Sequence, residues 1–168
     1  MGLDHIAFVM ALCLLSLRVS SLVWQVSAFT LAHTLTLGLS LMGLITLPIN
    51  IVEILIAFSI AFVAFENIAT TKMHRWRPLI VFMFGLLHGV GFASALRELG
   101  LPSGDWLTSL IFFNIGVEIG HLTVVALTLL VIFWWRKKHW YRKAIQIPIS
   151  AIIGCVGLFW TIERIIQI

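Results

Sequence analysis

Six apolar stretches of about 20 residues dominate the sequence and constrain its fold more than any other feature. An α-helix needs about 20 such residues to cross the roughly 30 Å hydrocarbon core of a bilayer. Because lipid offers no hydrogen-bond partners to backbone N–H and C=O groups, each stretch is expected to be helical. The sequence therefore predicts an all-α, polytopic transmembrane bundle that forms one domain over residues 1–168, with spans at 3–20, 22–46, 49–70, 78–96, 106–135 and 145–166.

The composition excludes a soluble globular protein. Hydrophobic residues make up 61% of the chain, charged residues make up 11%, and the mean hydropathy is +1.08. A soluble domain is about half apolar and one quarter charged. The net charge of +4 does not indicate nucleic-acid binding, because the basic residues lie in short loops between apolar spans, where such residues contact lipid headgroups.

The distribution of Lys and Arg predicts the orientation of the helices. Nine of the eleven lie in alternate loops, which the six spans place on one side of the membrane: Arg18, Lys72, Arg75, Arg77, Arg136, Lys137, Lys138, Arg142 and Lys143. Cytoplasmic loops of membrane proteins carry an excess of Lys and Arg. We therefore expect these loops in the cytoplasm and both chain termini on the extracytoplasmic side.

Few ionisable residues lie within the predicted spans, and such residues indicate function by default because they are costly in hydrocarbon. They are Asp4, His5, His33, Glu53, Glu66, His88, Glu118 and His121. With a rise of about 1.5 Å per residue, most of them fall between the outer surface and the midplane of the membrane. Asp4 and His5 are expected at the outer mouth of the first span. Groups from five spans therefore share one slab of the bilayer.

The helical spacing of these groups indicates a metal site. Asn114, Glu118 and His121 follow one another at i, i+4 and i+7, which places them on one helix face. Glu-x-x-His is also the spacing by which carboxylate-bridged metal proteins take two ligands from one helix. We expect metal ligands at Asp4, His5, His33, His88, Glu118 and His121, and polar support from Glu53, Asn114, Thr30, Thr34 and Glu66.

Two glycine pairs have the GxxxG spacing that lets neighbouring membrane helices approach closely. They are Gly85 with Gly89, on either side of His88, and Gly116 with Gly120, beside Glu118. We expect both pairs to be packing sites that make room for the polar cluster.

The donor types favour a borderline divalent cation. Imidazole and carboxylate without thiolate suit Ni²⁺, Zn²⁺, Co²⁺ or Cu²⁺, whereas Cu⁺ prefers the sulfur of Cys and Met. Three functions remain open from the residues alone. The protein could transport the ion. It could be an intramembrane zinc hydrolase in which Glu118 or Asp4 is the general base. It could also be a structural part of a homo-oligomer or larger membrane complex, with no metal.

Several segments resemble the successive signature motifs of the HupE/UreJ family. These are GLDHIAF (2–8), FTLAHTLTL (29–37), VEILIAFSIAFVAFEN (52–67), FGLLHGVGFA (84–93) with ELGLP (98–102), and FNIGVEIGH (113–121). They occur in the family's order over residues 2–121. The motifs contain Asp4, His5, His33, Glu53, His88 and Glu118 as the family's polar positions.

The resemblance implies a multi-pass protein of the bacterial inner membrane with about six helices. The family is associated with hydrogenase and urease gene clusters, and its members are regarded as nickel permeases or accessory proteins. Members often have a signal peptide or an extracytoplasmic domain before the first motif, so a preceding segment stays open. This chain has His121 where the family motif leads us to expect Gln, which adds one possible metal ligand.

Overall fold

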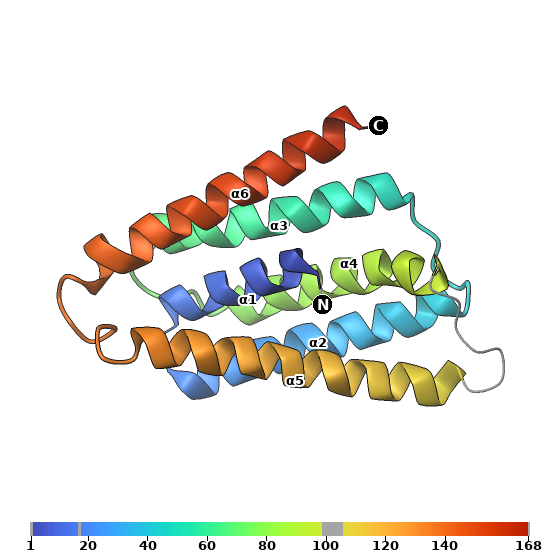
Figure 1. Ribbon diagram of the computed structural model, residues 1–168, viewed down its shortest axis with the longest axis horizontal. Coiled ribbons are helices and arrows are strands. Elements are labelled where there is room, and N and C mark those ends of the chain that lie inside the picture. Colours follow the sequence, from blue (N-terminus) through green and yellow to red (C-terminus); the bar gives the residue numbers. More distant parts are fainter. Residues whose placement is uncertain (1, 17, 99–105, 168) are drawn as a thin grey trace.

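The computed structural model describes residues 2–16, 18–98 and 106–167, and within them it contains helices and no strands (Figure 1). The elements are α1 (Leu3–Leu15), α2 (Val19–Leu41), α3 (Ile49–Ala69), α4 (Arg77–Glu98), α5 (Trp106–Ile132), a π-helical turn η1 (Arg142–Gln146) and α6 (Ile147–Ile166). The all-helical prediction is confirmed. Most of the chain break expected at 97–105 lies outside the described residues.

Five helices, α2 to α6, are long and apolar enough to cross a membrane, and α1 is not. The 13 residues of α1 give it a length of about 20 Å, against roughly 30 Å of hydrocarbon. The first span, expected over residues 3–20, therefore ends early, because the chain leaves the helix at Ser16 in an extended conformation. The side of the membrane on which each terminus lies stays a prediction.

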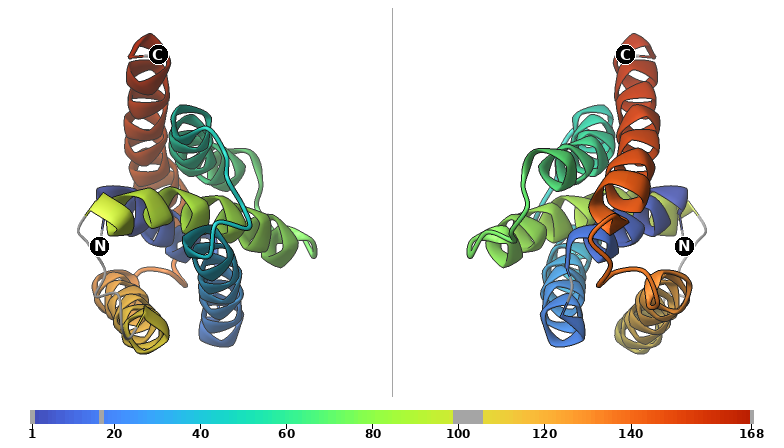
Figure 2. Two further views of the ribbon diagram at one scale, coloured as in Figure 1. Left: turned by 90° about the vertical axis from the view of Figure 1, so that its right-hand side faces the viewer. Right: turned by 90° about the vertical axis from the view of Figure 1, so that its left-hand side faces the viewer.

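The helices form three layers, and α4 crosses the molecule obliquely (Figures 1 and 2). The middle layer is α1 and α4, with α3 and α6 on one side and α2 and α5 on the other. The most extensive contacts are between α2 and α4 and between α3 and α6, and α1 contacts members of both outer layers. The short helix α1 therefore joins two tightly packed helix pairs.

One end of the bundle holds the loops that contain the nine clustered basic residues, and we call it the basic end. There α1, α3 and α5 end and α2, α4 and α6 begin (Figure 1). The first residues of α1 lie about halfway along the bundle, not at the opposite end (Figure 1). A half-length helix that ends at the basic end must begin near mid-depth, and this sets the position of His5.

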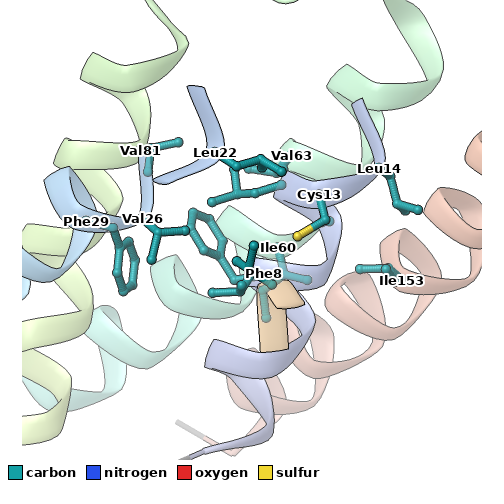
Figure 3. Packing of buried hydrophobic residues seen from close by; sticks show 14 of the residues in the cluster. Phe8, Cys13, Leu14, Leu22, Val26, Phe29, Ile60, Val63, Val81 and Ile153 are labelled. Carbon is teal, nitrogen blue, oxygen red and sulfur yellow. The ribbon is translucent and has the colours of Figure 1, made fainter. Parts of the chain in front are cut away.

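The apolar core surrounds α1 in the half of the bundle nearer the basic end (Figure 3). Phe8 and Leu12 of α1 pack against Leu22 and Val26 of α2 and against Ile60 of α3, and all five side chains are buried. In lipid, where apolar surface alone does not drive helices together, the close van der Waals packing of these side chains holds α1 inside the bundle.

A polar network closes the basic end behind this core. The fully buried Arg77 of α4 pairs with Glu66 at 3.2 Å and donates to Asn67 Oδ1 at 3.1 Å, so it is tied to the end of α3. Asn67 donates to the backbone oxygen of Ala11 at 2.7 Å. Arg142 donates to the last carbonyls of α3, which have no partners within that helix. The network joins α1, α3, α4 and η1.

Helices α2 and α4 lie in direct backbone contact at the glycine pair of α4. A Cβ atom on Gly85 would lie 2.5 Å from the backbone oxygen of Phe29, and one on Gly89 would lie 2.2 Å from that of His33. Thr36 Oγ1 also donates to the backbone oxygen of Leu86 at 2.7 Å. Only a residue without a side chain permits this approach. Gly116 differs, since a Cβ there meets no atom within 4 Å.

We expect Gly89→Ala to destabilise the protein and Gly116→Ala to leave its stability nearly unchanged. The added methyl group at position 89 must push α2 and α4 apart, and overpacking of this kind costs about 1–3 kcal/mol. In a chain of this size that lowers the melting temperature by about 2–4 °C per kcal/mol. Thermal unfolding in detergent checks both variants. Equal melting temperatures would contradict the close contact between α2 and α4.

Candidate metal centre

Four histidines from four helices meet in the interior of the bundle. His5 of α1 is central: its ring centre lies 4.9 Å from that of His88, 5.5 Å from that of His33 and 5.7 Å from that of His121. His33, His88 and His121 are fully buried, and His5 is 5% exposed. The two remaining histidines, His74 and His139, are exposed. The cluster forms because α1 begins at the depth at which the other three histidines lie.

The imidazoles of this four-histidine cluster have unused nitrogen atoms. Five buried ring nitrogens have no hydrogen-bond partner in the protein, namely Nε2 of His5, His88 and His121 and both nitrogens of His33. Only two ring nitrogens have partners that would fix their orientation. His88 Nδ1 contacts the backbone oxygen of Phe84 at 2.8 Å, and His121 Nδ1 contacts Thr30 Oγ1 at 3.1 Å. Buried polar atoms are normally satisfied, so five in one place require an explanation.

Phenylalanine rings pack against the imidazoles of the cluster. Phe29 lies 5.0 Å from His88 and 5.4 Å from His121, centre to centre. Phe8 lies 5.3 Å from His88 on the side of the apolar core, and Phe92 lies 5.7 Å from His5. These apolar neighbours provide no hydrogen bonds, so the ring nitrogens stay available to a ligand.

The spacing between His5 and each of the other three rings suits a cation shared by two imidazoles, although the present orientation of the rings does not. Two imidazoles on one tetrahedral ion have ring centres roughly 5 Å apart, because each metal–nitrogen bond is about 2.0–2.1 Å. The distances from His5 are in this range. Among the described residues, however, no three His, Cys, Asp or Glu side chains are arranged to hold an ion. Ion binding would therefore need the imidazoles to rotate within the cluster.

Asp4, predicted as a metal ligand, and Glu53, predicted as polar support, both contact Arg164 of α6. Asp4 is next to His5 in sequence, but its carboxylate pairs with Arg164 of α6 at 2.9 Å. Glu53 is exposed, and its backbone oxygen accepts a second bond from Arg164 at 2.8 Å. The helical rotation of about 100° per residue turns Asp4 away from its neighbour. Arg164 thus fastens the start of α1 to α3 and α6.

Glu118 and Asn114 lie on α5 and contact α2. Glu118 Oε1 accepts from Ser27 at 3.2 Å, and Asn114 Oδ1 accepts from Thr34 at 2.7 Å. Within the described part of the chain, no histidine nitrogen lies within 4.0 Å of a carboxylate oxygen. Glu118 Oε2 is nevertheless buried without a partner, one helical turn from His121.

Glu66, expected as polar support for the metal, belongs to the network with Arg77 at the basic end. Along α1, the buried residue Phe8 lies between His5 and residues 11–15, the part of the helix that is nearer this network. Arg77 was predicted only as a topology-determining loop residue. Apart from the presence of the two charged residues, nothing in the sequence indicates that Arg77 is buried beside Glu66.

A pocket of about 240 Å³ reaches the cluster at His5. Its other walls are Phe92 of α4 and Phe112, Phe113, Gly116 and Val117 of α5. The space beside Gly116 is therefore part of this pocket and not a helix contact. Phe112 is 69% exposed, so the pocket lies beside the exposed, apolar face of α5. It is an approach to His5 from the half of the molecule away from the basic end.

Sequence comparison identifies the family of this chain. The family model described as "HupE / UreJ protein" matches residues 1–164, nearly the whole sequence. The chain belongs to the HupE/UreJ family. Searches of curated proteins and of solved structures find no match.

The structure sorts the polar positions of this HupE/UreJ protein into two groups. The histidines of three motif segments, His5, His33 and His88, come together. The acids Asp4, Glu53 and Glu118 lie around them and make contacts of their own. His121, where we expected Gln from the family motif, joins the histidines. His121 therefore adds a fourth imidazole to the three that come from the motif segments.

We expect Asp4 and Arg164 to be coupled to each other, and Asp4 not to be needed for ion binding. A double-mutant cycle with Asp4→Asn and Arg164→Gln should give a coupling energy of about 1 kcal/mol, since both side chains are partly exposed. Thermal unfolding of the four proteins measures it. Additive effects would show that the ion pair does not hold α1, and loss of metal binding in Asp4→Asn would make Asp4 a ligand.

Proposed function

We propose that this HupE/UreJ protein binds a divalent transition-metal ion of the nickel type between His5, His33, His88 and His121, as a step in moving the ion across the membrane. The observation that carries the proposal is the set of five buried ring nitrogens without partners. Each unsatisfied buried polar group costs about 1–3 kcal/mol. A cluster that served only to join helices would have satisfied these groups with one another.

The ligand chemistry favours an ion that is bound transiently and transported over an ion that is held permanently for structural stability. Neutral imidazoles bind borderline ions such as Ni²⁺, Zn²⁺, Co²⁺ and Cu²⁺, but they leave the charge of the ion uncompensated. The nearest available counter-charge is Glu118, whose Oε2 is buried and free, one turn from His121. An ion that is held by neutral donors and incompletely neutralised is released more easily, as transport requires.

The two sides of the cluster differ, and this supports a direction of entry. The pocket beside Phe92 and Phe113 approaches His5 from the side away from the basic end. Toward the basic end, the buried core of Phe8, Leu12 and Leu22 and then the Arg77 network block the way. With the basic end in the cytoplasm, the ion enters from outside, and inward release needs α1 or α4 to move.

An intramembrane zinc hydrolase is the second candidate, and the apolar pocket beside His5 favours it. Such a pocket would accept the hydrocarbon part of a lipid-like substrate, with His5, His33, His88 and His121 as the residues that would hold zinc. The zinc ion would supply an activated water. Of the two proposed general bases, Asp4 counts against it because it pairs with Arg164, whereas Glu118 keeps Oε2 without a partner.

Loss of a cluster histidine should abolish metal accumulation. Cells that express His33→Ala or His88→Ala should accumulate Ni²⁺ at the level of cells without the protein, and the purified variants should bind Ni²⁺ at least about tenfold more weakly than wild type. The controls are His74→Ala and His139→Ala, because both residues are exposed in loops at the basic end. Wild-type accumulation in the cluster variants would exclude transport through this site. Binding without accumulation, together with hydrolysis of a lipid ester, would favour the hydrolase.

If His33 is present for ion binding and not for folding, replacing it should make the metal-free protein more stable. We expect His33→Phe to raise the melting temperature of the metal-free protein, because it removes two buried nitrogens without partners and keeps a planar ring. It should also remove the stabilisation that Ni²⁺ gives the wild type. Melting curves with a chelator and with Ni²⁺ measure both effects. A less stable metal-free variant would indicate that His33 has a structural role.

A further inference from the structure

A second polar pocket, of about 380 Å³, lies at the basic end, far from the histidines in the fold. Its walls come from the link between α1 and α2 and from the link between α3 and α4, and they are Leu15, Ser16, Arg18, Ser21, Thr71, Lys72 and Met73. We propose that this pocket binds the phosphate headgroup of an anionic phospholipid of the leaflet at the basic end, with an acyl chain lying along α2. This proposal is independent of the metal site.

The charge of the pocket lacks a counter-charge in the protein. Arg18 and Lys72 face it from opposite links, and no acidic residue lines it. Among the described residues, the acidic residue at the basic end is Glu66, and it already forms an ion pair with Arg77. In the described residues, neither Arg18 nor Lys72 forms an ion pair. Basic pockets of this kind on the cytoplasmic side of membrane proteins bind anionic headgroups.

Contacts within the protein hold the two walls together. Gln25 is fully buried, and its Nε2 donates to the backbone oxygen of Ser21 at 3.0 Å and to Met73 Sδ at 3.4 Å. Ser21 Oγ also donates to Met73 Sδ at 3.4 Å. Because sulfur is a weak hydrogen-bond acceptor, the Ser21 hydroxyl can readily donate to a phosphate oxygen in place of Met73 Sδ. The pocket therefore exists before any ligand arrives, and it presents hydroxyl donors beside its two cations.

The surface next to the pocket favours a lipid over free phosphate. Trp24 follows Ser21 by three residues on the same face of α2 and is 67% exposed. Leu31 and Leu35 continue this face toward the other end of the helix and are 67% and 53% exposed. An indole at headgroup level above a stripe of leucines is a surface for an acyl chain that begins at a phosphate. Free phosphate would make no use of this stripe.

Lipid retention by the full-length protein tests the proposal. Wild type, Arg18→Gln/Lys72→Gln and Lys137→Gln/Lys138→Gln are purified in a neutral detergent and titrated with phosphatidylglycerol or phosphatidylcholine. Native mass spectrometry counts the bound lipids. The control variant, Lys137→Gln/Lys138→Gln, likewise loses two positive charges, from exposed residues of another loop at the basic end. We expect wild type and control to bind phosphatidylglycerol at least about tenfold more tightly than the pocket variant does, from two lost cationic contacts. Equal affinity in all three proteins would overturn the proposal.

Two further measurements keep the proposal testable if the pocket variant does not fold. The first is competition of millimolar inorganic phosphate with phosphatidylglycerol for the wild type. Effective displacement would indicate a free-anion site and would overturn the assignment to lipid. The second is fluorescence quenching by phosphatidylglycerol with brominated chains. We expect stronger quenching than with brominated phosphatidylcholine, and the excess should be lost in Trp24→Phe. An excess that is unchanged in Trp24→Phe would place the lipid elsewhere.

Discussion

The contact between α2 and α4 at Gly85 and Gly89 is the interaction on which the rest of the structure depends. It brings two helix backbones together so closely that no side chain fits between them. That contact fixes the relative depth of His33 and His88, because a shift of either helix would bring side chains into the gap. In hydrocarbon, where apolar surface alone does not drive helices together, close packing of this kind is a principal source of association. The histidine cluster is built on this pair.

The short helix α1 completes the cluster, and its length is the reason. A full span would have placed His5 at the membrane surface, whereas a helix of 13 residues that ends at the basic end begins inside the bundle. The apolar face around Phe8 holds α1 in place, and Arg164 holds its first turn through Asp4. The acid beside the histidine thus positions the helix, and the histidine remains available for a ligand.

The two sides of the histidine cluster differ in what lies next to them. At the basic end, Arg77, Glu66 and Asn67 form a buried polar network that joins several helices. Buried charges in lipid are tolerated when they are paired, as Arg77 is with Glu66. On the other side, an aromatic pocket reaches His5. This asymmetry is the observation behind the proposed direction of entry.

The sequence by itself determined the helical membrane fold and the family, and it predicted His5, His33, His88 and His121 as candidate ligands. Twenty-residue apolar stretches have few alternatives in lipid, and ionisable residues within them are too costly to occur without a use. Only the tertiary structure decided which charges join the site. A carboxylate near a histidine in sequence takes whichever partner the packing brings within about 3 Å, and for Asp4 that partner is Arg164, 160 residues away. Pairings across helices depend on depth and rotation, which a single sequence does not specify to within one turn.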